Sequence, residues 1–100
     1  MNAYAAAAGT RVLAIDDDPS MLKLVSHMLG GAGYVVETAC EGKEGLDMIR
    51  ARHPDLVLCD IQMPGKSGFD VLDAVRSDAA SAALPFVLLT SLSDRESSGS

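Results

Sequence analysis

Residues 56–60 read Leu56-Val57-Leu58-Cys59-Asp60, an apolar run of strand length that ends in an acid. The run has no alternation of polar and apolar residues, which is typical of a parallel strand buried on both faces of a sheet. Three further short apolar runs occupy residues 12–15, 34–36 and 86–89. We therefore expect four strands in one parallel sheet.

Helical patterns fill the segments between these runs. Apolar residues recur at intervals of three and four in residues 21–29, and glycines follow as a stop signal. Further helices are expected over residues 42–52 and about 68–75. The residues of the third helix expected to face the core are Phe69, Leu72 and Val75. Strict alternation of strand and helix requires right-handed crossovers, and it predicts an α/β fold with a doubly wound parallel sheet between two helical layers.

The composition is that of one globular domain. The chain has 100 residues, 48% of them hydrophobic, and a formal net charge of −6. The acidic balance disfavours direct contact with nucleic-acid phosphates or anionic lipid, and no apolar run approaches the roughly 20 residues that span a bilayer. We expect a cytoplasmic domain with no direct nucleic-acid or membrane contact. Cys40 and Cys59 lack metal-binding spacing and are expected to be reduced, buried thiols.

Acidic residues follow two of the expected strands. Asp16 and Asp17 come directly after the first strand, and Asp60 comes after the third. The carboxyl ends of strands flank the binding crevice of an open α/β sheet, so these carboxylates are expected to converge. Their mutual repulsion is relieved by a hard divalent cation, for which Mg²⁺ is the natural candidate. Asp18 precedes Pro19 and is expected to cap the first helix instead.

A carboxylate held beside a metal can act as a nucleophile on phosphorus, and Asp60 is the candidate. Charge would then develop on the phosphoryl oxygens, and Thr90 closes the fourth strand at the same edge of the sheet as a hydroxyl donor. Residues 61–68 form a tight loop after Asp60 that contains one proline and two glycines. This loop can turn a backbone carbonyl toward the metal, although it is equally compatible with an ordinary turn into a helix.

Three segments together resemble the receiver domain of two-component response regulators, and they are residues 12–19, 54–68 and 85–91. The most specific feature is the loop in which Asp60 is followed by Met63 and Pro64. The resemblance implies a flavodoxin-like three-layer αβα fold. The expected boundaries are a disordered leader at residues 1–10, an incomplete receiver domain at 11–96 and a flexible tail at 97–100.

The resemblance also implies roles for particular residues. Asp60 would accept a phosphoryl group from a histidine kinase or phosphotransfer protein. The chain would catalyse only its own phosphoryl transfer and hydrolysis, so it would not be an enzyme in the usual sense. Asp17 and Asp60 would bind Mg²⁺ directly, and Asp16 would act mainly through a metal-bound water. The backbone carbonyl of Gln62 would complete the ligands, and Thr90 would hydrogen-bond the phosphoryl group and move with it.

The sequence departs from the receiver pattern at its end. Receiver domains continue into a fifth strand that carries a lysine and then into a closing helix, and this sequence stops before either. We therefore expect a sheet that lacks the final strand and helix, with residues 86–89 as an unpaired apolar edge. Self-association as a homo-oligomer or a domain-swapped dimer would bury this edge.

Two other functions fit parts of the sequence. Haloacid-dehalogenase-type phosphohydrolases place two aspartates one residue apart after their first strand, which Asp16 and Asp18 imitate, with Asp16 as nucleophile and Thr90 as a second motif. This alternative leaves the loop after Asp60 unexplained. A non-catalytic scaffold that acts through self-association, with little phosphoryl chemistry, is the other alternative.

Overall fold

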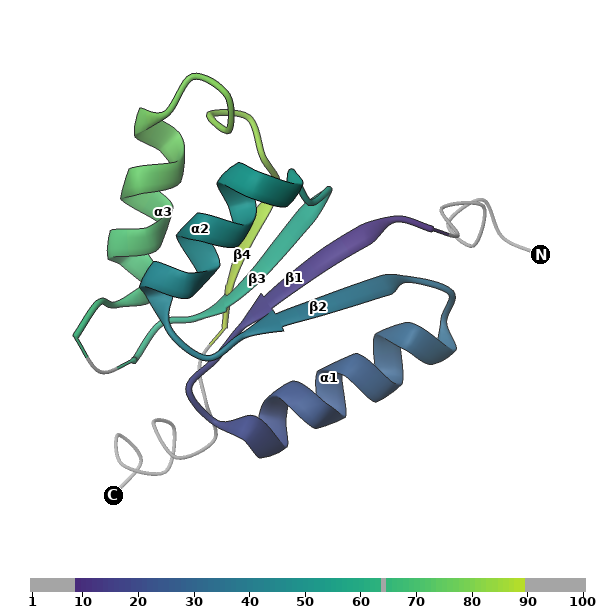
Figure 1. Ribbon diagram of the computed structural model, residues 1–100. Helices are drawn as coiled ribbons and strands as arrows, with labels where there is room; N and C mark the ends of the chain where they lie inside the picture. Colours follow the sequence, from purple (N-terminus) through teal and green to yellow (C-terminus); the bar gives the residue numbers. More distant parts are fainter. Residues whose placement is uncertain (1–8, 64, 90–100) are drawn as a thin grey trace.

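The computed structural model describes residues 9–63 and 65–89. Within these residues one parallel sheet has the strand order β2-β1-β3-β4. Its strands are β1 (Arg11–Ile15), β2 (Val35–Ala39), β3 (Leu56–Asp60) and β4 (Phe86–Leu89). The connecting helices are α1 (Pro19–Gly31), α2 (Gly42–Arg52) and α3 (Gly68–Ser77). Figure 1 shows α2 and α3 on one face of the sheet and α1 on the other, which confirms the predicted doubly wound three-layer fold.

Strand β1 shows why the central strands read as continuous apolar runs. Leu13 and Ile15 join the main hydrophobic cluster under α2 and α3. Val12 and Ala14 alternate with them along the strand and are also buried. Because helices cover β1 on both faces, no position of the strand favours a polar residue. The main cluster contains Leu13, Ile15, Ala39, Leu46, Ile49, Val57, Cys59, Met63, Val71 and Val75.

Local hydrogen bonds explain where the helices begin. The Asp18 side chain accepts a hydrogen bond from the Ser20 amide at 2.9 Å, so Asp18 caps α1 as predicted. Helix α3 begins with a capping box in which Ser67 and Asp70 each accept a hydrogen bond from the backbone amide of the other. Helix α2 ends at Arg52 and is followed by the C-cap residue His53, whose φ of 50° lies in the left-handed region. These caps fix the loops on either side of the sheet.

The structure corrects three sequence predictions. Phe69 is 57% exposed, because Val71 and Val75 face the sheet and Phe69 lies outside their stripe of α3. Strand β2 begins and ends later than the predicted 34–36, since Glu37 and Thr38 pair with β1 despite their polarity. Cys40 is exposed rather than buried because it follows the end of β2.

The order of the strands creates the position for a site. The chain moves from β1 to β2 on one side and then returns across the sheet to place β3 on the other side of β1. The winding direction therefore reverses between β1 and β3, whose register pairs Ile15 with Cys59. A crevice outside the carboxyl ends of these two strands is the usual ligand position in open α/β sheets.

Candidate functional site

Three acidic side chains meet at this reversal point. Asp16 and Asp17 follow β1, and Asp60 is the last residue of β3. One carboxylate oxygen from each residue lies within 4.8 Å of the other two. The adjacent strands and their register produce this proximity, since Asp60 follows directly after the pair Ile15 and Cys59. The structure thus brings together the three acids on which the predicted metal site depends.

The three acids differ in their surroundings. Asp60 is 4% exposed, Asp16 is partly buried and Asp17 is exposed. Asp16 is held by its own amide, which donates to the Ala39 carbonyl at 3.0 Å, and by the Asp18 amide, which donates to Oδ1 of Asp16 at 2.9 Å. Burial raises the pKa of Asp16 from its ordinary 3.8, and the negative charge of Asp17 adds to the rise although the Asp18 amide opposes it. Proton release from Asp16 is therefore favoured by a nearby cation.

The donor set fits Mg²⁺. Carboxylate oxygens are the ligands that this hard cation prefers, at about 2.0–2.1 Å, so two directly bound oxygens are at most about 4.2 Å apart. An upper separation of 4.8 Å is compatible with direct binding by some of the carboxylates and binding of another through water. An exposed acid beside a buried one also leaves room for water ligands, which Mg²⁺ usually keeps.

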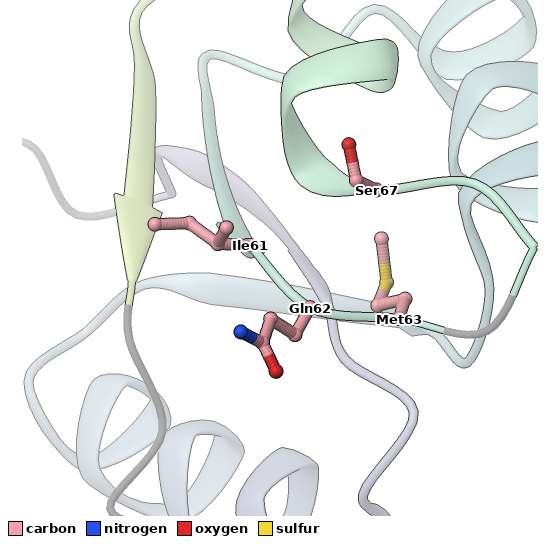
Figure 2. Close-up of a pocket in the computed structure, with 4 residues that line it drawn as sticks. All are labelled: Ile61, Gln62, Met63 and Ser67. Carbon is pink, nitrogen blue, oxygen red and sulfur yellow. The ribbon is translucent and has the colours of Figure 1, made fainter. Parts of the chain in front are cut away.

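The segment after Asp60 lines an open depression beside the acids. Its lining residues are Ile61, Gln62, Met63 and Ser67. Figure 2 shows the Met63 side chain directed toward Ser67 at the start of α3, and the Gln62 side chain directed the other way. Met63 is buried in the main cluster, which holds this part of the loop against the protein. The predicted role of the Gln62 carbonyl as a ligand stays a prediction.

Thr90, the predicted hydrogen-bond donor to the phosphoryl group, lies outside the described residues. The structure does describe β4, the strand that precedes Thr90. Its last residue, Leu89, pairs with Asp60, and the Ile61 amide donates to the Leu89 carbonyl at 3.0 Å. The role of Thr90 stays a prediction. The predicted leader at residues 1–10 and the tail at 97–100 likewise lie largely or wholly outside the described residues.

Two glycines pack closely near the site, and the sequence analysis did not anticipate this. The Gly68 amide donates to the Ile61 carbonyl at 2.8 Å, and a methyl group on Gly68 would clash with the Asp60 carbonyl oxygen. A methyl group on Gly42 would lie 3.0 Å from Lys66 Cδ. The signal was present in the sequence, since glycine often marks a close approach of backbone, but its partners depend on the tertiary structure.

Both cysteines lie near the same edge of the sheet. Burial and the charge of Asp60 raise the pKa of Cys59 to about 12. The exposed Cys40 donates from its backbone amide to Oε1 of Glu44 at 2.9 Å, and its thiol is 3.4 Å from the same oxygen. The hydrogen bond and the charge of Glu44 raise the pKa of Cys40. Neither thiol is therefore favoured as a nucleophile at neutral pH.

Comparison with known proteins gives the family. A family model described as "Response regulator receiver domain" matches residues 12–99. The chain belongs to this family of receiver domains. This membership agrees with the parallel sheet and the acidic cluster, and it favours the receiver interpretation over the alternative with Asp16 as the nucleophile of a phosphohydrolase.

Individual relatives and solved structures support the assignment. The chain is 37% identical over 84 residues to the DNA-binding response regulator MtrA of Mycolicibacterium smegmatis. This match covers 84% of this chain and 36% of that protein. It is 40% identical over 82 residues to the DNA-binding dual master transcriptional regulator RpaA of Synechocystis, and this match covers 82% of this chain and 34% of that protein. The solved chemotaxis response regulator CheY4 of Vibrio cholerae matches with a TM-score of 0.80 and 36% identity, covering 91% of this chain and 76% of that one.

These comparisons bear on the predicted partners and location. The chain spans about a third of the length of the curated relatives it matches. Two of these relatives are named as DNA-binding or as transcriptional regulators, so the prediction that this protein makes no direct nucleic-acid contact is not supported. Among the described residues, no helix is long and apolar enough to cross a bilayer. A cytoplasmic location stays a prediction.

Proposed function

We propose that Asp60 accepts a phosphoryl group from a histidine kinase or phosphotransfer protein in a Mg²⁺-dependent reaction. The observation that carries the proposal is the cluster of Asp16, Asp17 and Asp60, with oxygens within 4.8 Å of one another at the carboxyl ends of β1 and β3. These three carboxylates, with the backbone carbonyl of Gln62, would hold the metal. Family membership over residues 12–99 supports the same role.

In this reaction a carboxylate oxygen of Asp60 attacks phosphorus and forms an O–P bond. The N–P bond of the donor phosphohistidine breaks, and the leaving imidazole nitrogen keeps the bonding electron pair and takes a proton from solvent. Bound Mg²⁺ would neutralise the carboxylates and the charge on the phosphoryl oxygens. Asp60 is buried and its strand is paired on both sides, and both features restrict the orientation of the nucleophile. Thr90 would donate a hydrogen bond to the transferred group.

Phosphorylation of the folded chain by a small acyl phosphate tests the proposal. Intact-mass measurement should show one added phosphoryl group in the presence of Mg²⁺ and none in excess EDTA, and the Asp60→Asn variant should gain none. Asp73→Asn is the matched control, since it makes the same chemical change at an exposed position of α3. Equal phosphorylation of the Asp60→Asn variant would contradict the assignment, and labelling that depends on Asp16 alone would instead favour the phosphohydrolase.

We also propose that the chain self-associates through the sheet face that carries α1. Val87 is 42% exposed and Leu89 is 38% exposed, and both alternate with Phe86 and Leu88, which pack on the opposite face. Helix α1 contacts β2 and β1, while no comparable contact with β3 or β4 exists among the described residues. Light scattering over a concentration series should show a rising mass that Val87→Lys reduces. A mass equal to one chain at every concentration would contradict this proposal.

A further inference from the structure

Gly68, the first residue of α3, lies directly against the backbone of Asp60. Gly68 is buried, and its amide donates to the Ile61 carbonyl at 2.8 Å. A methyl group on Gly68 would clash with the Asp60 carbonyl oxygen and would lie 3.0 Å from the Cα of Ile61. The same methyl group would lie 2.9 Å from Cδ2 of Leu88, the end of a side chain that can rotate away. The two backbone contacts cannot be relieved in this way, so only glycine lets α3 begin this close to Asp60.

Neither side of this contact can move away freely. Strand β3, which ends at Asp60, is paired with β1 and with β4, and Ile61 is hydrogen-bonded to the last residue of β4. Helix α3 is anchored by Val71 and Val75, which are 0% and 1% exposed in the main hydrophobic cluster. Withdrawal of the helix would open space around these two side chains, which dense packing makes costly. A side chain at position 68 would therefore push against the peptide group that joins Asp60 to Ile61.

We infer that Gly68 is a positioning residue for the nucleophile, because the bare backbone at this position supports the Asp60 peptide and so sets where the Asp60 carboxylate lies relative to Asp16 and Asp17. The inference rests on the proposed phosphoryl transfer to Asp60. The supported carbonyl and the carboxylate belong to one residue, so a displacement of the first moves the second. A misplacement of about 1 Å can cost about 10²-fold in the rate of a reaction that depends on exact geometry.

Gly68→Ala tests the inference, because it adds only the methyl group. At saturating Mg²⁺, the initial rate of phosphorylation by a small acyl phosphate, followed by intact mass and expressed per folded chain, should fall about 10- to 100-fold. The dissociation constant for Mg²⁺ should rise about 10-fold, as is typical when a group that supports a metal ligand is changed. Urea titration of the same sample gives the folded fraction. A rate and an affinity equal to those of the wild type would overturn the inference.

Two control variants separate support of Asp60 from general stability. Val75→Ala removes buried side-chain volume near the other end of α3, so it should lower the free energy of unfolding and still be phosphorylated at the wild-type rate per folded chain. Gly30→Ala should also keep the wild-type rate, since a methyl group there meets nothing within 4 Å. A fall in rate for Val75→Ala as large as that for Gly68→Ala would assign the effect to stability and overturn the inference.

A double variant shows which contact of Gly68 matters. Gly68→Ala combined with Leu88→Ala removes the contact with the Leu88 side chain and keeps the clash with the Asp60 carbonyl. The rate of the double variant should therefore stay as low as that of Gly68→Ala. Recovery to the wild-type rate would assign the effect to Leu88 and overturn the support of Asp60.

A measurement on the wild type decides if Gly68→Ala does not fold. Binding of Mg²⁺ should shift the amide resonance of Gly68 and leave that of Gly30 unchanged, and an unchanged Gly68 resonance would overturn the inference. The proposed function fails separately. A wild type that neither bound Mg²⁺ nor gained a phosphoryl group would refute that function and the positioning role with it, whereas equal phosphorylation of the wild type and Gly68→Ala would refute the positioning role alone.

Discussion

Removing one carboxylate from the acidic cluster should stabilise the metal-free fold and weaken its stabilisation by Mg²⁺. We choose Asp17→Asn, because Asp17 is exposed and its amide replacement disturbs no packing. Two unit negative charges 4.8 Å apart repel by about 0.9 kcal/mol in a water-like medium. Asp17 has two such neighbours and faces solvent, and salt screens part of the repulsion, so the expected stabilisation is about 1 kcal/mol. For a domain of this size, that corresponds to an unfolding temperature about 4–8 °C higher.

Magnesium should stabilise the wild type more than Asp17→Asn. A ligand at ten times its dissociation constant stabilises the folded state by about 1.4 kcal/mol, so the wild type should gain about that much when Mg²⁺ replaces EDTA. Asp17→Asn should gain much less, which would bring the two unfolding temperatures close together or reverse them. Differential scanning calorimetry at low salt measures both shifts, with Asp73→Asn as the control for net charge.

Three outcomes would contradict the roles given to Asp17. If Asp17→Asn were no more stable than the wild type in EDTA, the three carboxylates would not repel one another at the distances found. If the variant kept the full Mg²⁺ shift, Asp17 would not belong to the metal site. An equal gain for Asp73→Asn in EDTA would assign the effect to net charge instead of the cluster.

Single features of the structure also determine how individual substitutions should act. The pKa of Asp16 is raised in the folded state, so ionisation of Asp16 destabilises the metal-free fold as the pH rises above 3.8. Asp16→Asn should therefore have a higher free energy of unfolding than the wild type at about pH 7. In urea titrations this difference should shrink as the pH falls toward about 4. His53→Gly should raise the free energy of unfolding, measured by urea titration, by about 0.5–1 kcal/mol, since left-handed φ costs a non-glycine residue about 1–2 kcal/mol and glycine loses about 0.5–1 kcal/mol in chain entropy. A lower free energy of unfolding would contradict this. Glu44→Gln should speed alkylation of Cys40 at pH 8 about 2- to 10-fold by lowering its pKa, while the buried Cys59, with its pKa raised to about 12, stays unmodified in the folded chain.

Much of the fold could be predicted from the sequence because local and global preferences agree in its central elements. The run at residues 56–59 is apolar throughout, and β3 occupies Leu56–Asp60. Helix α2 begins and ends at the predicted residues, Gly42 and Arg52, because the chain turns left-handed at His53 and proline follows. In these elements, side-chain pattern and chain-breaking residues point to the same boundaries.

Prediction failed where the two faces of an element are not equally covered. Phe69 was expected inside from its hydrophobicity, yet its position on α3 faces away from Val71 and Val75. Residues 37 and 38 were not expected in a strand because they are polar, but β2 is an outer strand of the described sheet, where polar side chains are tolerated. Hydrophobicity alone does not show which side of a helix or strand meets the sheet.

Only those parts of the candidate site that the order of the strands determines could be predicted from the sequence. Two acids at the ends of neighbouring parallel strands must lie close together, so the proximity of Asp17 and Asp60 could be foreseen. The contact of Lys66 with Gly42 could not, because these residues are far apart in the sequence and neither carries a motif of its own. It depends on how the start of α2 packs against the loop that precedes α3.

The central placement of β1 and β3 has a consequence for partial unfolding. Each of these strands is hydrogen-bonded on both sides, whereas β2 and β4 are the outer strands of the described sheet. Amide protons of an outer strand exchange with solvent through small openings that leave the pairing of Ile15 with Cys59 intact. The acids at the ends of β1 and β3 thus keep their mutual spacing while the margins of the sheet fray, and a phosphoryl group on Asp60 would outlast such local fluctuations.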